Sequence, residues 1–240
     1  MNTVVFQLYL LLHILGDFYL QSEKMAGSKK TKHRAVLLHG FVYALPFLVS
    51  LVFIQPSMAL INSLIFLIIL HICIDTIKFL FYNHGKYKES TLYLVDQGVH
   101  LISLAAVAIF IKPVPLQPAS WITKSLGPST FPYATLLVWT LCILILAKPS
   151  NITIRHIISR LGSKEETPRN NAGAMIGTIE RYIMIILLSL GQFGALALVM
   201  AAKSISRYEM LKDKDFAEYY LLGTLLSILI VLIVWLLLFL

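Results

Sequence analysis

A histidine and an aspartate lie four residues apart within an apolar stretch near the start of the chain. They are His13 and Asp17. A spacing of four places both side chains on one face of a helix, one turn apart. Ionisable groups within apolar segments are rare, and they usually face the interior of a helical bundle and serve a function. The pair therefore predicts a site at which an imidazole and a carboxylate act together.

The same spacing recurs twice further along the chain. His71 precedes Asp75 by four residues, and Asp96 precedes His100 by four residues in the reverse order. His39 adds a fourth imidazole within an apolar segment. Each of the three aspartates among the first 212 residues thus lies four residues from a histidine. Such repetition indicates one shared polar centre rather than unrelated polar residues.

Imidazole and carboxylate together are typical ligands of Zn²⁺, Fe²⁺ or Mn²⁺, and three protein ligands with an open position are typical of a catalytic site. We therefore expect a divalent metal, with zinc the first choice and iron or manganese as alternatives. So many ligating groups also allow a two-metal site. The principal ligands are expected to be His13, His71 and His100. The further ligands, orienting groups or general base are expected among Asp17, Asp75 and Asp96, and His39 is a ligand or an acid–base group. In catalysis itself we expect Asp17, His39 and Asp96.

Two other interpretations of this cluster stay open. The polar side chains could form hydrogen bonds that hold the helices together. They could also form a proton or cation relay in a transporter, which requires a continuous polar path. The outer halves of the first four spans read as apolar, which argues against such a path.

Several polar residues outside the cluster are candidates for supporting roles. Gln21 and Gln97 could donate hydrogen bonds to metal ligands, or they could bond at the inner boundary of the membrane. Lys78, three residues after Asp75, is expected to extend its ammonium group towards water rather than to pair with a carboxylate. The candidates for binding an anionic headgroup are Arg181, Lys203 and Arg207, and the alternative for the last two is an ordinary basic flank of a membrane segment.

The composition indicates a polytopic α-helical membrane protein. Apolar residues make up 58% of the 240 residues and charged residues 13%, against about 25% charged in soluble domains. The formal net charge of +8 is attributed to membrane topology, and no nucleic-acid motif is found. Both cysteines lie in predicted spans, so disulfides are not expected.

Six full spans are predicted, together with a segment that is ambiguous. The spans cover about residues 3–20, 35–54, 59–82, 91–111, 133–147 and 216–240, and residues 152–161 could form an interfacial helix. Residues 172–200 form either a seventh span or a re-entrant hairpin broken near residues 189–192. The chain then divides into a four-span half (1–112), a Pro-rich outer loop (113–132) and a C-terminal membrane half (133–240).

Most of the lysines and arginines fall in the predicted inner loops when the hairpin is chosen, which agrees with the positive-inside rule. The N-terminus then lies outside, and the loop at residues 23–34 lies in the cytoplasm. At a rise of about 1.5 Å per residue, the seven histidines and aspartates of the cluster fall in two adjacent tiers of the cytoplasmic half. The spacing of four residues within each pair does not by itself require all seven residues to lie at a similar depth.

The stretches that carry these residues resemble an uncharacterised prokaryotic family of polytopic membrane proteins, a domain-of-unknown-function group encoded beside SatD-like proteins. The matching stretches are residues 13–21, 39–40, 71–75, 96–100, 176–181, 202–207 and 218–224. The resemblance implies a site at the His and Asp positions but no activity. A more distant similarity, of motif style only, is to membrane-bound metal-dependent hydrolases.

We therefore expect a multi-pass protein of the cell membrane that hydrolyses an amphiphilic or lipid-like substrate with a bound metal, reached from the cytoplasmic side. One alternative is a transporter of a metal ion or a proton-coupled solute. Another is a non-enzymatic membrane component that works through a cytoplasmic protein partner at the basic loops. Membrane lipid is an expected partner in each case, nucleic acid is not, and the sequence also allows a homo-oligomer.

Overall fold

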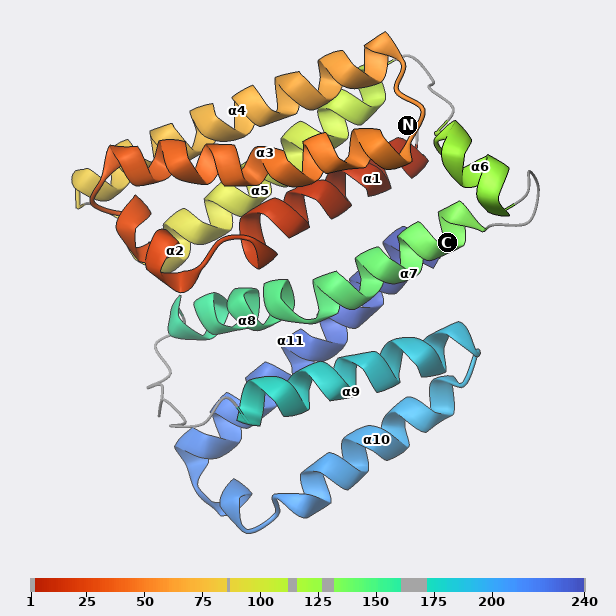
Figure 1. The fold of residues 1–240 in the computed structure, drawn as a ribbon. Helices are drawn as coiled ribbons and strands as arrows, with labels where there is room; N and C mark the ends of the chain where they lie inside the picture. The colour runs from red at the N-terminus through yellow and green to blue at the C-terminus, as the bar shows by residue number, and fades with distance from the viewer. Residues whose placement is uncertain (1–2, 86, 112–115, 127–131, 161–171, 240) are drawn as a thin grey trace. The chain divides into compact units, whose positions relative to one another are not determined.

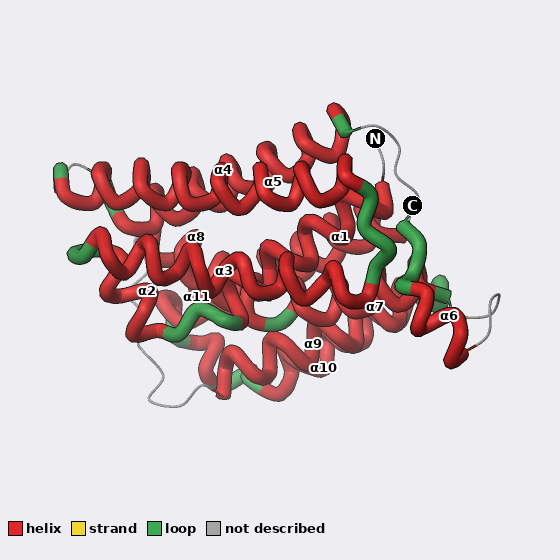
Figure 2. The backbone as a smooth tube through the Cα atoms, turned by 45° about the horizontal axis from the view of Figure 1, so that its top comes forward, coloured by secondary structure: helices red, strands yellow, loops and turns green. Residues whose placement is uncertain are grey.

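The computed structural model describes residues 3–239 except 86, 112–115, 127–131 and 161–171. Figure 2 shows the described residues as helices joined by loops, without a strand among them. The predicted all-helical fold is confirmed for this part of the chain. Parts of the Pro-rich segment 113–132 and of the basic loop that ends near residue 171 lie outside the described residues. The chain forms two compact units, Met1–Leu141 and Cys142–Leu240, and the three predicted segments stay a prediction.

Four long helices make up most of the N-terminal unit. They are α1 (Thr3–Ile14), α3 (His33–Phe53), α4 (Met58–Asn83) and α5 (Glu89–Phe110). The helix α4 packs against α3 on one side and α5 on the other, α5 packs against α1, and the end of the first span packs against α3. Figure 1 shows these helices side by side. The four helices therefore enclose one shared interior.

The first span ends differently from the prediction. The α-helix stops at Ile14, and a π-helical turn, η1 (Leu15–Tyr19), follows. The chain then bends by 90° into the short helix α2 (Glu23–Lys29), which the Ser22 side chain caps by accepting a hydrogen bond from the Met25 N–H. This bend turns α2 back towards α3, with which it is in contact.

Long apolar helices recur along the chain, as the composition predicts. Five helical segments are long and apolar enough to cross a membrane, and the bent pair at the N-terminus would make a sixth. Their bounds agree with the predicted spans to within a few residues, except that the segment Tyr133–Arg160 continues past the predicted end at residue 147. This segment consists of α7 (Tyr133–Leu146) and α8 (Lys148–Arg160), so α8 begins before the predicted interfacial helix.

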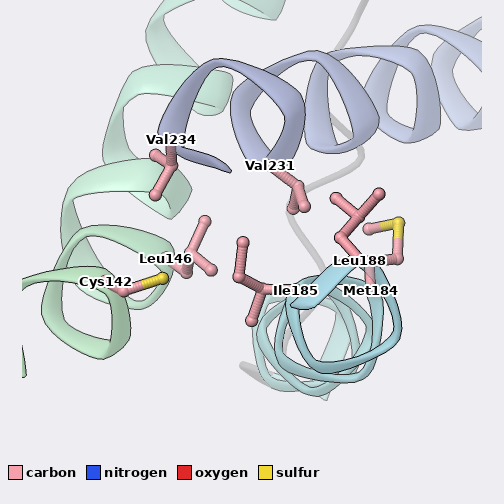
Figure 3. Packing of buried hydrophobic residues seen from close by; sticks show 7 residues of the cluster. All are labelled: Cys142, Leu146, Met184, Ile185, Leu188, Val231 and Val234. Atoms are coloured by element: carbon pink, nitrogen blue, oxygen red, sulfur yellow. The ribbon is translucent and has the colours of Figure 1, made fainter. Parts of the chain in front are cut away.

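The C-terminal unit contains the end of α7, then α8, α9 (Ala172–Ser189), α10 (Phe193–Ser206), the 3₁₀ turn η2 (Met210–Lys212) and α11 (Lys214–Phe239). Figure 3 shows its apolar core, to which α7, α9 and α11 each contribute side chains. The buried residues are Cys142, Leu146, Met184, Ile185, Leu188, Val231 and Val234.

The helices α9 and α10 form a hairpin whose turn lies where the sequence predicts the break. Gly191 adopts a φ of 70°, a left-handed conformation that glycine tolerates best. The Gln192 N–H donates to the carbonyl of Leu187 at 2.8 Å, which ends α9 in the manner of a Schellman motif. Glu180 on α9 pairs with Lys203 on α10 at 2.6 Å, so opposite charges hold the two arms together.

Candidate metal site

All seven predicted histidines and aspartates lie in the interior of the N-terminal unit. His13 ends α1, Asp17 lies in η1, and His39 lies on α3. The helix α4 supplies His71 and Asp75, and α5 supplies Asp96 and His100. None of the seven is more than 7% exposed. Four segments that are far apart in the sequence therefore place four imidazoles and three carboxylates in one buried cluster.

Two glycines allow the backbones to come close enough for these contacts. A Cβ atom added at Gly16 would lie 2.6 Å from Cδ2 of Tyr43 on α3, and one added at Gly40 would lie 2.6 Å from Cγ1 of Ile72 on α4. Real Cβ atoms do not approach other atoms so closely, because packed interiors have no spare volume. The glycines thus fix the distance of α3 from its two neighbours.

The π-helical turn sets the direction of Asp17. In η1 the Leu20 N–H donates to the carbonyl of Leu15 at 2.9 Å, five residues back, which widens the turn that contains Asp17. Turns of this kind occur often at functional sites. The Asp17 carboxylate contacts the facing helices: Oδ1 is 3.1 Å from Nε2 of His39, and Oδ2 accepts a hydrogen bond from Nε2 of Gln97 at 2.8 Å.

A first set of ligating atoms, which we call set A, consists of Asp17 Oδ1, His39 Nε2 and His71 Nε2. The two imidazole nitrogens are 3.2 Å apart, and Oδ2 of Asp75 lies 3.6 Å from each of them. Ligands bound to a tetrahedral ion at about 2.0–2.1 Å are about 3.3–3.4 Å from one another. The observed separations of 3.1–3.6 Å are therefore close to those of a coordination shell.

A second set, set B, consists of one oxygen of Asp75, one oxygen of Asp96 and Nε2 of His100. Nε2 of His100 lies 3.9 Å from Oδ1 of Asp75 and 3.5 Å from Oδ1 of Asp96. Asp75 thus directs one oxygen towards each set.

His13 lies beside both sets, and its ring nitrogens contact neighbouring polar groups. A nitrogen atom of His13 comes within 4.8 Å of one on His71 and one on His100, so the three predicted principal ligands are brought together. Nε2 of His13 is 3.4 Å from Oε1 of Gln97, and Nδ1 is 3.2 Å from the hydroxyl of Tyr43. Because the amide oxygen only accepts, His13 donates from Nε2 and accepts the Tyr43 proton at Nδ1.

Two lysines neutralise two of the three carboxylates. The Lys29 ammonium on α2 lies 2.6 Å from Oδ2 of Asp75, and the Lys78 ammonium lies 2.6 Å from Oδ2 of Asp96. The expectation that Lys78 would extend towards water was wrong, because Asp96 on the neighbouring helix is within its reach. These two ammonium groups thus supply positive charge to the cluster.

Three participants were not predicted from the sequence: Tyr43, Lys29 and the Lys78–Asp96 pair. The ring of Tyr43 stacks on that of His71 with their centroids 3.5 Å apart. Its position four residues after His39 places it on the same helical face, and this signal could have identified it. Lys29 had no such signal, because only the bend after η1 brings α2 to the cluster.

Both predicted supporting glutamines contact cluster residues or their partners. Gln97 donates to Asp17 and also, at 3.2 Å, to Oδ2 of Asp96. Gln21 accepts a hydrogen bond from Lys29 at 2.9 Å. Both glutamines therefore lie close enough to the cluster to orient a metal ligand, and that role stays a prediction.

The predicted headgroup ligands belong to the C-terminal unit. Arg181 is 1% exposed and donates to the carbonyl of Leu146 and to three side chains, those of Asn151, Thr178 and Ser227. The Lys203 ammonium pairs with Glu180 and lies 5.2 Å from the centroid of the Tyr220 ring. Arg207 follows the last residue of α10. Glu180 and Arg181, which are adjacent in the sequence, contact different partners.

Comparison with known proteins identifies the N-terminal unit. No curated protein and no solved structure was found to match the chain. A family model described as "Protein of unknown function (DUF3307)" matches residues 5–127, just over half of the 240 residues. The matched segment includes all seven histidines and aspartates of the cluster, as well as Lys29, Tyr43, Lys78 and Gln97. The chain therefore belongs to this DUF3307 family.

Proposed function

We propose that this protein is an integral membrane metal-dependent hydrolase, with a divalent cation held by Asp17, His39 and His71. The observation that carries the proposal is the convergence of set A. Its carboxylate oxygen only accepts hydrogen bonds, and at most one proton fits between two imidazole nitrogens 3.2 Å apart. Lone pairs that converge on one point, at the separations of a coordination shell, favour a metal ion. Zinc suits two imidazoles and one carboxylate best, and iron or manganese would also fit.

The surroundings of set A suit the hydrolysis of an ester or amide. Asp17, His39 and His71 would hold the cation by three ligands, and a cation bound in this way would supply a water molecule of lowered pKa. Asp75 Oδ2, 3.6 Å from both imidazole nitrogens, is placed to accept the proton of that water. The oxygen of the water then forms a bond to the carbonyl carbon, the bond to the leaving group breaks, and Asp75 returns its proton to the leaving group. Lys29 stabilises the ionised form of Asp75 between these steps.

The proposed topology places this chemistry within reach of the cytoplasmic leaflet. It has six full spans and a re-entrant hairpin formed by α9 and α10, with the N-terminus outside. The substrate is then an amphiphilic molecule that reaches the cluster from the inner side of the membrane. Arg181 is not kept as a headgroup ligand in this proposal, because its donors already bind protein groups.

Metal analysis of the purified protein tests the site. We expect bound zinc, iron or manganese in the wild type and a loss of at least one ion per chain in His71→Ala. The control is His84→Ala, which removes an exposed imidazole at the end of α4 and should leave the metal content unchanged. Equal metal in the wild type and His71→Ala would contradict the proposal.

Turnover tests the reaction. Wild-type protein in nanodiscs, stripped by a chelator and then reloaded, should hydrolyse lipid-like esters or amides only after reloading. Asp75→Asn should bind substrate but hydrolyse it about 10²–10⁴ times more slowly, the usual contribution of an acid–base group. Hydrolysis that survives chelation would contradict the metal-dependent reaction.

A transporter is the second candidate, and one observation favours it. Polar side chains are also buried towards the N-terminal end of α1, away from the cluster: the Tyr9 hydroxyl lies 2.5 Å from the Ser63 hydroxyl on α4, and Gln7 is buried. The sequence interpretation of this region as purely apolar is thus too simple. Metal-dependent ion flux in proteoliposomes without any hydrolysis would favour the transporter over the enzyme.

A further inference from the structure

We propose that set B is a second cation site, in which Asp75, Asp96 and His100 bind a divalent metal beside the one in set A. The inference rests on the proposed function, because it makes the metal centre a two-metal centre: Oδ1 of Asp75 binds the second cation, while Oδ2 stays the proton acceptor beside set A. Its ligand is a divalent cation that accepts two oxygens and one imidazole, as manganese and zinc do.

The three ligating atoms of set B are buried and have no hydrogen-bond partner among the described residues. They are Oδ1 of Asp75, Oδ1 of Asp96 and Nε2 of His100, and their residues are 2–5% exposed. A buried polar atom without a partner has lost its hydrogen bonds to water and gained none in return, which is energetically unfavourable. Three such atoms that face one another therefore favour the binding of a ligand between them.

One proton on Nε2 of His100 can be directed at only one of the two carboxylate oxygens. The Nε2 atom lies 3.5 Å from the Asp96 oxygen and 3.9 Å from the Asp75 oxygen, and an N–H···O hydrogen bond has a usual length of about 2.7–3.2 Å. A cation between the three atoms, with bonds of about 2.0–2.2 Å, would contact all of them at once. These separations are longer than a hydrogen bond and suit a shared ion.

The neighbours of both carboxylates hold the free oxygens towards His100. Oδ2 of Asp96 is bound by Lys78 at 2.6 Å and by Gln97 at 3.2 Å, and Oδ2 of Asp75 pairs with Lys29. In each case the other oxygen, Oδ1, faces Nε2 of His100. Groups that hold a carboxylate by one oxygen and leave the other free are typical of the surroundings of metal ligands.

The ring of His100 is also held in place. It stacks on the ring of His71 with a centroid distance of 4.4 Å, and His71 contributes Nε2 to set A. One ligand of each set thus packs directly against a ligand of the other. Two adjacent cations can together stabilise the charge that develops on the attacking and leaving oxygens of a hydrolysed bond, which a single cation does less well.

The stoichiometry of manganese binding tests the second site. Purified full-length protein, stripped and reloaded with Mn²⁺, should bind two ions per chain in the wild type and one in Asp96→Asn or His100→Asn. Asp17→Asn should also bind one, because it removes a ligand of set A only. Glu89→Gln is the matched control, since it alters an exposed carboxylate of the same helix α5 and should still bind two. Gel filtration and circular dichroism, recorded for every variant, show that it is folded.

Electron paramagnetic resonance gives a second readout, independent of activity. The wild type should show a spin-coupled manganese pair, and Asp96→Asn the spectrum of an isolated ion. One ion in the wild type that is kept in Asp96→Asn but lost in Asp17→Asn would overturn the second site and leave the proposed function standing. Absence of bound manganese, zinc and iron from the wild type would overturn both.

Discussion

Replacement of Arg181 by methionine should weaken the C-terminal unit more than any exposed substitution. The guanidinium group is buried and donates hydrogen bonds to four acceptors on the chain. One acceptor is the carbonyl of Leu146, the last residue of α7, and another is Ser227 on α11. Methionine fills a similar volume and adds no charge, but it donates nothing. The acceptors would then lack their partner.

The expected loss follows from the hydrogen bonds. Bonds between helices within membranes contribute about 0.6 kcal/mol on average and up to about 1.7 kcal/mol each. The bonds to Leu146 and Asn151 are short, at 2.7 and 2.6 Å, and those to Thr178 and Ser227 are longer, at 3.1 and 3.3 Å. We therefore expect the free energy of unfolding to fall by about 2–5 kcal/mol. Arg181→Lys should recover little of it, because one ammonium group cannot reproduce the planar fork of donors.

Unfolding of the purified protein in detergent, followed by circular dichroism, measures this loss. The control is Arg155→Met, which removes an exposed arginine from α8 in the same unit. It should change the free energy of unfolding by less than about 0.5 kcal/mol. A loss below 1 kcal/mol in Arg181→Met would refute the reasoning, since the guanidinium group would then not be a structural link. Binding of an anionic lipid headgroup would become the better explanation of its burial.

Three further predictions concern packing, the metal centre and topology. Gly40→Ala should lower the free energy of unfolding by about 1–3 kcal/mol in the same assay, because its Cβ would meet Ile72. The control is Gly27→Ala, whose Cβ meets nothing within 4 Å and which should not lower it. Equal losses in the two variants would refute the steric cause. Gln97→Leu should lower the metal affinity about 10–100-fold in competition with a chelator, because it frees Asp17 and Asp96 to turn; an unchanged affinity would show that these carboxylates need no anchoring. In a cysteine-free background, Ser28→Cys should react with an impermeant thiol reagent only from the cytoplasm and Ser125→Cys only from outside, and the opposite pattern would reverse the proposed orientation.

Much of the fold could be predicted because its signals are local. The length of each apolar run determines the bounds of a helix that must cross hydrocarbon, and α3, α4 and α5 begin and end within two residues of the predicted spans. The turn at Gly191 could be located because few residues accept its backbone conformation. The spacing of four between His71 and Asp75 fixes a shared helical face, which is where the structure places them.

The parts of the site that could not be predicted from the sequence depend on contacts between distant segments. The approach of α3 to its neighbours is set by Gly16 and Gly40, and no periodicity states which helix each glycine will face. The bend that brings Lys29 to Asp75 follows from the π-helical turn, whose extra residue per turn leaves no clear mark in the sequence. The prediction for Lys78 was wrong for the same reason. Whether its ammonium group contacts water or Asp96 depends on the position of the neighbouring helix.

The two lysine–aspartate pairs bear on the order in which the protein is assembled. Lys29 pairs with Asp75 and Lys78 with Asp96, so among the described residues of the cluster Asp17 is the carboxylate without a lysine partner. The bundle can thus insert and close before any ion arrives, unlike small zinc domains, which stay unfolded without their metal. If the proposed metal binds, it would then be taken up after folding, and the supply of metal would control activity without controlling the amount of folded protein.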